Sequence, residues 1–322
     1  MSAISVPKGL DAPSRPPAAG EGVFFHADDM GATPSMTARM CDSWEGGLVD
    51  SFSVFGNCDH LGMITFRLAA RPDRPARISV HLNLAEGRPL TPLVRATGLV
   101  DRDGYLDAEF VGMVKRLHVG STMRERNAVL SLVEREWRAQ IENVMRAIER
   151  RQVAALDGHI HMHMVPALFR LAVKLARDYG IPEIRNVREP FYLSPSIREC
   201  CSKRFLANCL KREILSRFSI ENSQVAEADG VRSPDRLIGV LYSGMMSRSN
   251  IFAGIAASRR RGAKRIEVLV HIGRAELTEL GRWNGRRSRA WFVLSPSRDR
   301  EYLELMKVRM AATGSARIDS TP

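Results

Sequence analysis

Residues 23–31 read VFFHADDMG, an apolar run that ends in two aspartates and a glycine. A short run rich in Val and Phe that stops at polar residues is typical of a buried strand. Adjacent carboxylates at a strand end project in different directions, because side chains alternate along an extended chain. Asp28 and Asp29 can therefore serve two roles, one at a metal and one at a substrate. A helix N-cap beside a turn is an equally open alternative here.

Similar apolar segments recur along the chain, with helical patterns between them. They lie at residues 49–55, 77–82, 153–159, 181–187, 237–242 and 266–271. The clearest helical pattern spans Met123 to Arg151, and another runs from Pro166 to a stop at Gly180. Alternating strands and helices form βα units around a parallel sheet. The sequence therefore predicts an α/β fold, a distorted or seven-stranded TIM-like (β/α) barrel with its site at the carboxyl ends of the strands.

The chain has 322 residues, of which 44% are apolar and 26% charged, a composition that excludes disorder. We expect a single barrel domain over residues 21–312, with a helical insertion near residues 190–236 and flexible tails at 1–20 and 313–322. The chain shows no membrane-span pattern and no signal-peptide pattern. Five irregularly spaced cysteines suit neither a disulfide framework nor a paired zinc site, so we expect a cytoplasmic protein.

The net charge is 48 − 36 = +12, an excess that favours anionic partners. The densest basic runs lie at residues 259–265 and 282–289. A solvated surface is the favoured interpretation for both runs, because no nucleic-acid motif accompanies them. We therefore expect no nucleic acid partner, and peripheral contact with the inner face of an anionic membrane is the main alternative.

Histidines and aspartates concentrate at the ends of the predicted strands. His81 lies in the third strand, and Asp157, His159, His161 and His163 follow each other at steps of two. If that segment stays extended, all four face one side, too polar a row to bury without a partner. Asp29, His81 and His159 would supply one carboxylate and two imidazoles, a set that leaves metal positions open for water and substrate. A buried core histidine is the alternative for His81, and an exposed histidine strand for the later group.

In chain order, these residues resemble the ChbG/HpnK carbohydrate deacetylase family, also called YdjC-like. The matching segments are HADDMG at 26–31, HLNL at 81–84, GRPL at 87–90, DGHIHMH at 157–163, REP at 188–190 and EVLVH at 267–271. The likeness spans residues 23–305. The region Arg185 to Pro190 and the closing helix at 297–312 are more similar to the hopanoid-biosynthesis branch, HpnK, than to the chitooligosaccharide branch, ChbG. Two positions depart from the family pattern: Met30 stands in place of Phe, and Ile272 follows His271 where a proline is usual.

The resemblance implies a metal-dependent hydrolase that removes the N-acetyl group from an amino sugar and releases acetate. The substrate would be a glycolipid such as an N-acetylglucosaminyl hopanoid, or a chitooligosaccharide, and a homodimer is compatible with the family. One divalent ion would be bound by Asp29, His81 and His159. The family implies magnesium, while the ligand set also accepts zinc, cobalt or manganese.

The resemblance also implies roles for the neighbouring residues. Asp28 would act as general base and His271 as the acid that protonates the departing amine. Contact with the substrate or support of the ligands would fall to Asp157, His161, His163, Arg185 and Glu189.

Two other functions stay open at this point, a metal-dependent phosphoesterase and a non-catalytic relative that binds anionic lipid. A two-metal phosphoesterase needs more carboxylate ligands than the pattern offers. Retention of the polar set argues against the non-catalytic relative, because unused buried polar groups only destabilise a fold.

Overall fold

The computed structural model describes residues 22–93, 97–148, 153–283 and 291–318. Its seven strands form one parallel sheet in the order β5-β4-β3-β2-β1-β7-β6. The predicted tail at residues 1–20 lies outside the described ranges. The strands are β1 (Gly22–Met30), β2 (Ser51–Phe55), β3 (Arg77–Leu82), β4 (Val153–Gly158), β5 (Glu183–Ile184), β6 (Arg236–Ile238) and β7 (Arg265–Val270).

The two edges of the sheet approach each other around β5 and β6. The Ile184 amide donates to the Arg232 carbonyl at 2.9 Å, and the Arg232 amide donates to the Pro182 carbonyl at 3.0 Å. Further along, the Leu237 amide donates to the Arg188 carbonyl at 3.4 Å. The sheet therefore curls into a barrel-like form with a thin seam, as predicted for a distorted seven-stranded barrel.

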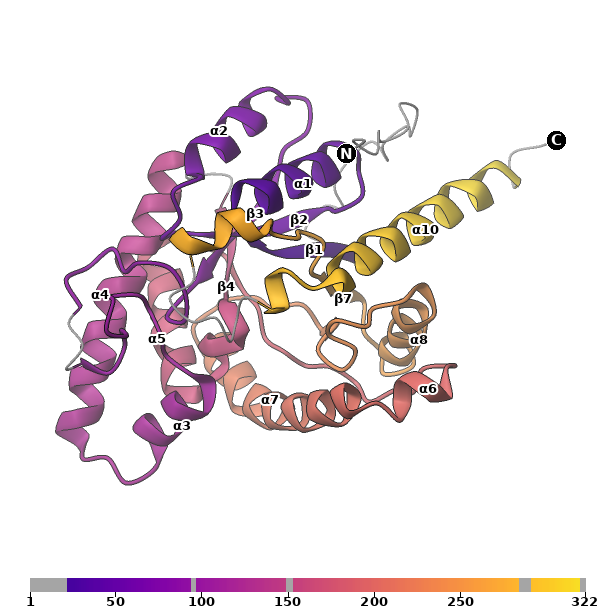
Figure 1. Cartoon of the computed structure of the whole chain (residues 1–322). Coiled ribbons are helices and arrows are strands. Elements are labelled where there is room, and N and C mark those ends of the chain that lie inside the picture. The colour runs from indigo at the N-terminus through magenta and orange to yellow at the C-terminus, as the bar shows by residue number, and fades with distance from the viewer. Residues whose placement is uncertain (1–21, 94–96, 149–152, 284–290, 319–322) are drawn as a thin grey trace.

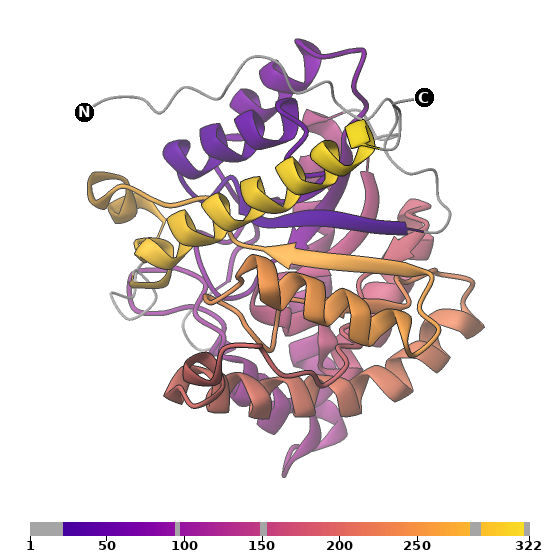
Figure 2. The same ribbon diagram turned by 90° about the vertical axis from the view of Figure 1, so that its right-hand side faces the viewer.

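Helices surround the strands (Figure 1). The last long helix lies between the first helix and the helix before β7 (Figure 2), where Arg39 contacts Asp299 and Glu304 accepts from the Arg248 amide at 2.9 Å. The helices are α1 (Pro34–Glu45), α2 (Leu61–Ala69), α3 (Phe110–His118), α4 (Met123–Ala147), α5 (Pro166–Tyr179), α6 (Ile197–Cys200), α7 (Lys203–Ala228), α8 (Arg248–Arg259) and α10 (Pro296–Ile318), with the 3₁₀ segments η3 (His159–Met164) and η4 (Leu277–Arg282).

Local signals explain several of these boundaries. A reciprocal capping box between Thr122 and Glu125 starts α4 at the predicted residue. Gly180, with a left-handed φ of 68°, ends α5 where the sequence predicts a stop. The segment predicted as an insertion contains α6 and α7, which join β5 to β6. The helix α10 continues to Ile318, past the predicted boundary at 312.

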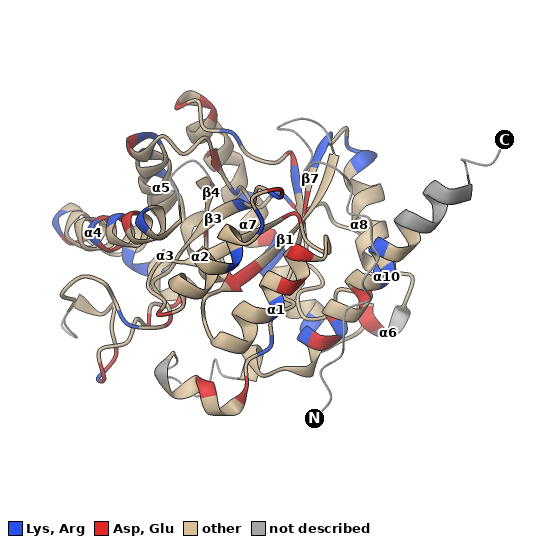
Figure 3. Cartoon of the chain, turned by 90° about the horizontal axis from the view of Figure 1, so that it is seen from above, with Lys and Arg blue, Asp and Glu red and all other residues tan. Residues whose placement is uncertain are grey.

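Charged residues on the surface occur with both signs. Basic and acidic residues are interspersed along α4 (Figure 3), where Arg138 contacts Glu134 at 2.8 Å. In the predicted basic run, Arg261 donates to the Ala257 carbonyl in the last turn of α8, a position where the helix dipole favours cations. Arg259 donates to the Ala263 carbonyl just after the helix. Most of the second run lies outside the described residues. No described helix has both the length and the apolar character that a membrane span requires.

The strands are buried on both faces, as a parallel sheet covered by helices requires. An apolar layer with Trp44, Phe52 and Trp137 fills the space between sheet and helices. The strands also enclose a buried polar cluster, which consists of His26, Asp28, Asp157, Arg185 and Glu267. This polar cluster adjoins the candidate site, because Asp157 bonds His81 at 2.6 Å.

Candidate metal centre

The two aspartates of β1 lie in an irregularity of the strand. The register pairs Ala27 with Phe52 and Met30 with Val54, so Asp28 and Asp29 together lie opposite the single residue Ser53. Asp29 has a φ of 76°, a conformation that non-glycine residues rarely adopt. This bulge, rather than simple alternation along a strand, separates the two carboxylates.

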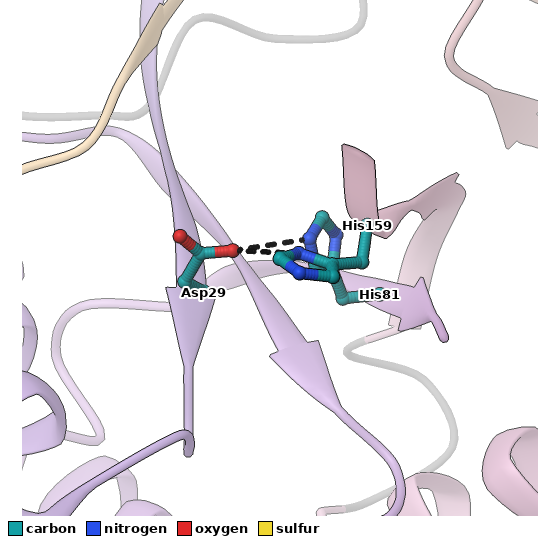
Figure 4. A group of neighbouring side chains, drawn as sticks. All are labelled: Asp29, His81 and His159. Carbon is teal, nitrogen blue, oxygen red and sulfur yellow. Dashed lines mark hydrogen bonds and ion pairs between the residues drawn. The ribbon is translucent and has the colours of Figure 1, made fainter. Parts of the chain in front are cut away.

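Asp29, His81 and His159 converge at the carboxyl ends of β1, β3 and β4 (Figure 4). Asp29 Oδ1 lies 3.4 Å from His81 Nε2 and 3.1 Å from His159 Nδ1. One ligand atom from each residue lies within 4.8 Å of the others, and all three side chains are buried. The structure thus brings together the three residues predicted to bind the metal.

A hydrogen bond at His81 Nδ1 fixes the orientation of the His81 ring. His81 Nδ1 bonds Asp157 Oδ1 at 2.6 Å, in line with the register that places the two residues side by side. His81 Nε2 is buried and has no hydrogen-bond partner among the described residues. A histidine that ligates a metal ion through one nitrogen usually donates its other N–H to a carboxylate. His81 has this arrangement, with Nδ1 on Asp157 and Nε2 facing Asp29 Oδ1. The residues present therefore suit a divalent cation.

Burial and neighbouring charges shift the pKa values of Asp29 and His81. Burial alone would raise the pKa of Asp29, but Arg298 and the two histidines outweigh it and hold that pKa well below the usual range. Burial would lower the pKa of His81, yet Asp157 and Asp28 raise it to about 10. Without a cation, a proton therefore compensates the buried carboxylates, and a bound metal ion would replace it.

Asp28 lies in a second cluster of potential metal ligands, together with His26 and Asp157. Arg185 donates to both oxygens of Asp28 at 2.8 Å, lies 3.2 Å from Asp157 and donates to Glu267 at 2.7 Å. Burial opposes ionisation of Asp28, but Arg185 and then His81 hold its pKa below the ordinary value. A guanidinium thus already bonds both oxygens of Asp28, which argues against a second metal ion at this carboxylate and against a two-metal phosphoesterase. Arg185 therefore supports Asp28 in this structure, and its contact with a sugar stays a prediction.

The histidine-rich segment turns after β4 instead of staying extended. The segment η3 starts at His159, and Ile160 and His161 have φ values of 50° and 60°. The expectation of four side chains on one face is therefore wrong beyond β4. His163 Nε2 donates to the Arg185 carbonyl at 2.9 Å in the tautomer that suits that acceptor, so it fastens the chain after β5. His161 Nδ1 is buried without a hydrogen-bond partner in the described ranges.

His271, directly after β7, is held through its backbone, whose amide donates to Glu301 Oε2 at 2.9 Å. Its ring packs edge-on against Phe292. Desolvation lowers the pKa of His271 to about 4, although Asp29 opposes the shift. The ring is therefore neutral at neutral pH and has one N–H to donate.

Glu189 contacts the loop that follows β6. Its carboxylate is buried and accepts from the amides of Gly239, Val240 and Leu241 at 2.7, 3.1 and 2.7 Å. Both oxygens are thus engaged by the loop after β6. Glu189 therefore supports that loop, and its contact with the substrate stays a prediction.

Several residues at the site were not among those predicted from the sequence. Arg298, in the first turn of α10, donates to Asp29 Oδ2 at 2.7 Å and is 1% exposed. Ser53 donates to Asp157 at 2.5 Å and lies 3.0 Å from Asp28. Glu86 lies 3.6 Å from His159. Each lies in or beside a segment that the sequence singles out: Ser53 in the strand predicted at 49–55, Arg298 in the closing helix at 297–312, and Glu86 before the GRPL motif at 87–90.

A cleft of about 570 Å³ opens beside the centre at the carboxyl ends of β1 and β2. Trp283 lines it, and the Trp283 ring also packs on Phe55 at 4.7 Å. The Phe55 ring in turn packs edge-on against His81 and His159, with ring centroids 4.8 and 5.1 Å apart. Asn57, His60, Arg88 and Tyr105 add polar and aromatic groups to the wall.

Comparisons with known proteins agree with this arrangement. Residues 22–313 match the profile of the family described as YdjC-like protein. A carbohydrate deacetylase of Danio rerio is 26% identical over 244 residues, which cover 73% of this chain and 72% of that protein. A carbohydrate deacetylase of Oceanobacillus iheyensis (29% identical) and a chitooligosaccharide deacetylase of Yersinia pestis (27% identical) match over half of this chain and cover 63% and 57% of those relatives.

The fold also has a counterpart among solved structures. A crystal structure from Enterococcus faecalis, provisionally described as a cellobiose-phosphate cleavage protein, superposes with a TM-score of 0.59 at 21% identity. The superposition covers 90% of this chain and 95% of that protein. At this identity the likeness establishes the shared fold.

Proposed function

The chain belongs to the YdjC-like protein family, and from this premise we propose that it is a metal-dependent hydrolase that removes the N-acetyl group from an amino sugar and releases acetate. The observation that carries the proposal is the convergence of Asp29, His81 and His159, with the buried His81 Nε2 left without a hydrogen-bond partner in the described structure. The names of the relatives, carbohydrate deacetylase and chitooligosaccharide deacetylase, support the same reaction class.

Hydrolysis of an acetamide needs an activated water, stabilisation of the oxyanion and a proton for the amine. A divalent cation held by Asp29, His81 and His159 would supply the first two, since such ions polarise carbonyl groups and can lower the pKa of water to about 7. We propose magnesium from the family resemblance, and zinc, cobalt or manganese suit the two imidazole ligands equally well.

Asp28 is the candidate general base. Arg185 fixes its carboxylate through both oxygens and keeps it ionised, so it is ready to accept a proton at neutral pH. Ser53 holds the same carboxylate from the side of Asp157. A positioned base contributes roughly 10²–10⁴ in rate.

His271 is the candidate donor to the departing amine. It follows β7, the strand that pairs with β1. The charges of Asp29 and Asp28 raise the pKa of its ring, against the larger effect of burial. The neutral ring can donate only a hydrogen bond, so it would have to take up a proton and act as an imidazolium to protonate the amine. His161, buried beside the centre with an unbonded Nδ1 among the described residues, is the candidate contact to the sugar.

The remainder of the substrate is a finer part of this proposal. The cleft beside Trp283 has room for a group linked to the acetylated sugar, and its mixed polar and aromatic wall suits a saccharide. We carry two substrates forward, an N-acetylglucosaminyl hopanoid and a chitooligosaccharide.

Acetate release tests the proposal directly. The purified protein is incubated with N-acetylglucosaminyl hopanoid in detergent, with diacetylchitobiose and with p-nitrophenyl phosphate, each with magnesium or zinc and with a chelator. We expect acetate from one acetylated sugar, loss of that activity with chelator and its return with metal. Phosphate release without acetate would instead identify a phosphoesterase.

A further inference from the structure

Glu86 is a buried carboxylate next to a candidate metal ligand. It follows β3 and is 5% exposed. Its Oε2 accepts a hydrogen bond from Trp283 Nε1 at 2.8 Å and lies 3.6 Å from His159 Nε2. Two asparagine side chains, Asn57 and Asn83, donate to the Glu86 carbonyl at 3.0 and 2.6 Å and fix the backbone at this point.

The two candidate ligand histidines each lie between Asp29 and a second buried carboxylate. Each turns one nitrogen toward Asp29 Oδ1 and the other toward a different buried carboxylate. For His81 that carboxylate is Asp157, which bonds Nδ1 at 2.6 Å. For His159 it is Glu86, at an ion-pair distance of 3.6 Å from Nε2, a nitrogen that has no hydrogen-bond partner among the described residues. A carboxylate on the far nitrogen of a ligating histidine fixes its tautomer and ring orientation and makes it a better ligand.

We propose that Glu86 is the positioning residue of His159, and that Trp283 holds Glu86 in place for this task. The inference rests on the proposed metal centre and adds two residues to its support. Neither residue would touch the metal ion or the substrate. Their effect would pass through the orientation of the His159 ring.

Two hydrogen bonds and close packing join Trp283 to the loop that contains Glu86. The Gly87 amide donates to the Trp283 carbonyl at 2.9 Å, beside the bond from the indole N–H to Glu86. Gly87 has a φ of 73°, and a Cβ on it would lie 2.9 Å from the indole ring, so a larger residue would displace Trp283. The segment that ends at Trp283 is thereby fastened to the loop that carries Glu86.

The alternative is that Glu86 only keeps its loop folded. Glu136 provides a control, because it is also buried and holds the other end of the same loop. It accepts from the Leu90 and Thr91 amides at 3.0 and 2.9 Å and forms no hydrogen bond or ion pair with His159 in the described structure. Loss of loop order alone would therefore affect both variants alike.

The test compares metal affinity in the wild type, Glu86→Gln, Trp283→Phe, the double variant and Glu136→Gln. Isothermal titration with Zn²⁺ and with Mg²⁺ gives the dissociation constants, and thermal unfolding of the metal-free proteins monitors folding. We expect Glu86→Gln to weaken binding about 10–100-fold, the range typical of such outer partners. Trp283→Phe should weaken it less, and the double variant no more than Glu86→Gln, because the two residues act in series.

The outcomes separate the inference from the proposed function. Unchanged affinity in Glu86→Gln, with a wild type that binds metal, would overturn the role of Glu86 and leave the metal centre standing. Equal weakening in Glu136→Gln would do the same by identifying loop order as the cause. If the wild type binds neither ion, the metal centre itself is wrong. Should Glu86→Gln fail to fold, Glu86→Asp replaces it, because the shorter side chain keeps the charge but withdraws the carboxylate from Trp283 and His159. Unchanged metal affinity in that variant would overturn the role of Glu86.

Discussion

Two adjacent aspartates in β1 have separate partners, and the difference sets their chemistry. Asp29 shares one oxygen between two histidines and gives the other to Arg298. Asp28 faces Arg185 and Ser53 instead. The bulge opposite Ser53 turns the two side chains apart, so a ligand and a base can be one residue apart in the chain.

Exchange of Asp28 for asparagine tests this division of roles. Asp28→Asn keeps the shape of the side chain but cannot accept a proton, so we expect the deacetylation rate to fall by roughly 10²–10⁴ while bound metal is retained. His159→Ala should lose both activity and metal. Acetate assays and metal analysis of dialysed samples measure the two quantities. Metal retained at the wild-type level in His159→Ala would remove that residue from the ligand set.

The sequence predicts some of these residues far better than others. Asp29, His81 and His159 stand at strand ends, and strand ends of a parallel barrel meet at one rim, so their convergence follows from the pattern of strands. Arg298 and Glu86 were missed because neither periodicity nor spacing shows which distant side chain will neutralise a buried carboxylate. Arg298 lies 269 positions from Asp29 in the chain.

At the scale of elements, prediction succeeded where local signals act and failed where tertiary contacts decide. The capping box at Thr122 and the glycine at 180 define helix ends in the sequence itself. The turn after Gly158 has no such signal, because residues with positive φ at 160 and 161 are non-glycine. The side chains around it, including the His163 bond to the Arg185 carbonyl, hold a conformation that local preference opposes.

Glu189 accepts hydrogen bonds from three amides of the loop after β6. Glu189→Ala would leave three buried amides, those of Gly239, Val240 and Leu241, without their acceptor. We expect the free energy of unfolding to fall by about 3 kcal/mol, within the range for buried donors left unpaired. Denaturant unfolding measures the loss, with the exposed Glu227→Ala as control. An equal effect in the two variants would contradict the assigned role.

At the scale of the whole molecule, buried charge helps to close the barrel. Glu183 of β5 is 2% exposed and pairs with Arg265 of β7 at 2.6 Å and with Arg77 of β3. These contacts tie three strands together next to the thin seam between β5 and β6.

Removal of that carboxylate should therefore weaken the entire fold. Because both arginines stay partly exposed and can regain water, we expect Glu183→Ala to lower the free energy of unfolding by about 2 kcal/mol, less than for a fully buried pair. Urea unfolding followed by circular dichroism and by tryptophan fluorescence should show one coincident transition. A loss confined to one probe would indicate that the seam opens locally.

Metal binding should also report on the whole fold, because its ligands and their supports come from β1, β3, the start of η3 and α10. An ion that binds only when these elements are assembled stabilises the folded state by mass action. At a free metal concentration of about 100 times the dissociation constant, the gain is about 2.7 kcal/mol. We expect thermal unfolding to shift upward with magnesium or zinc and downward with a chelator. In His81→Ala the shift should disappear, since one of the three ligands is lost. A shift of the same size in His81→Ala would mean that the ion binds elsewhere on the molecule, and the centre at the barrel mouth would lose its main support.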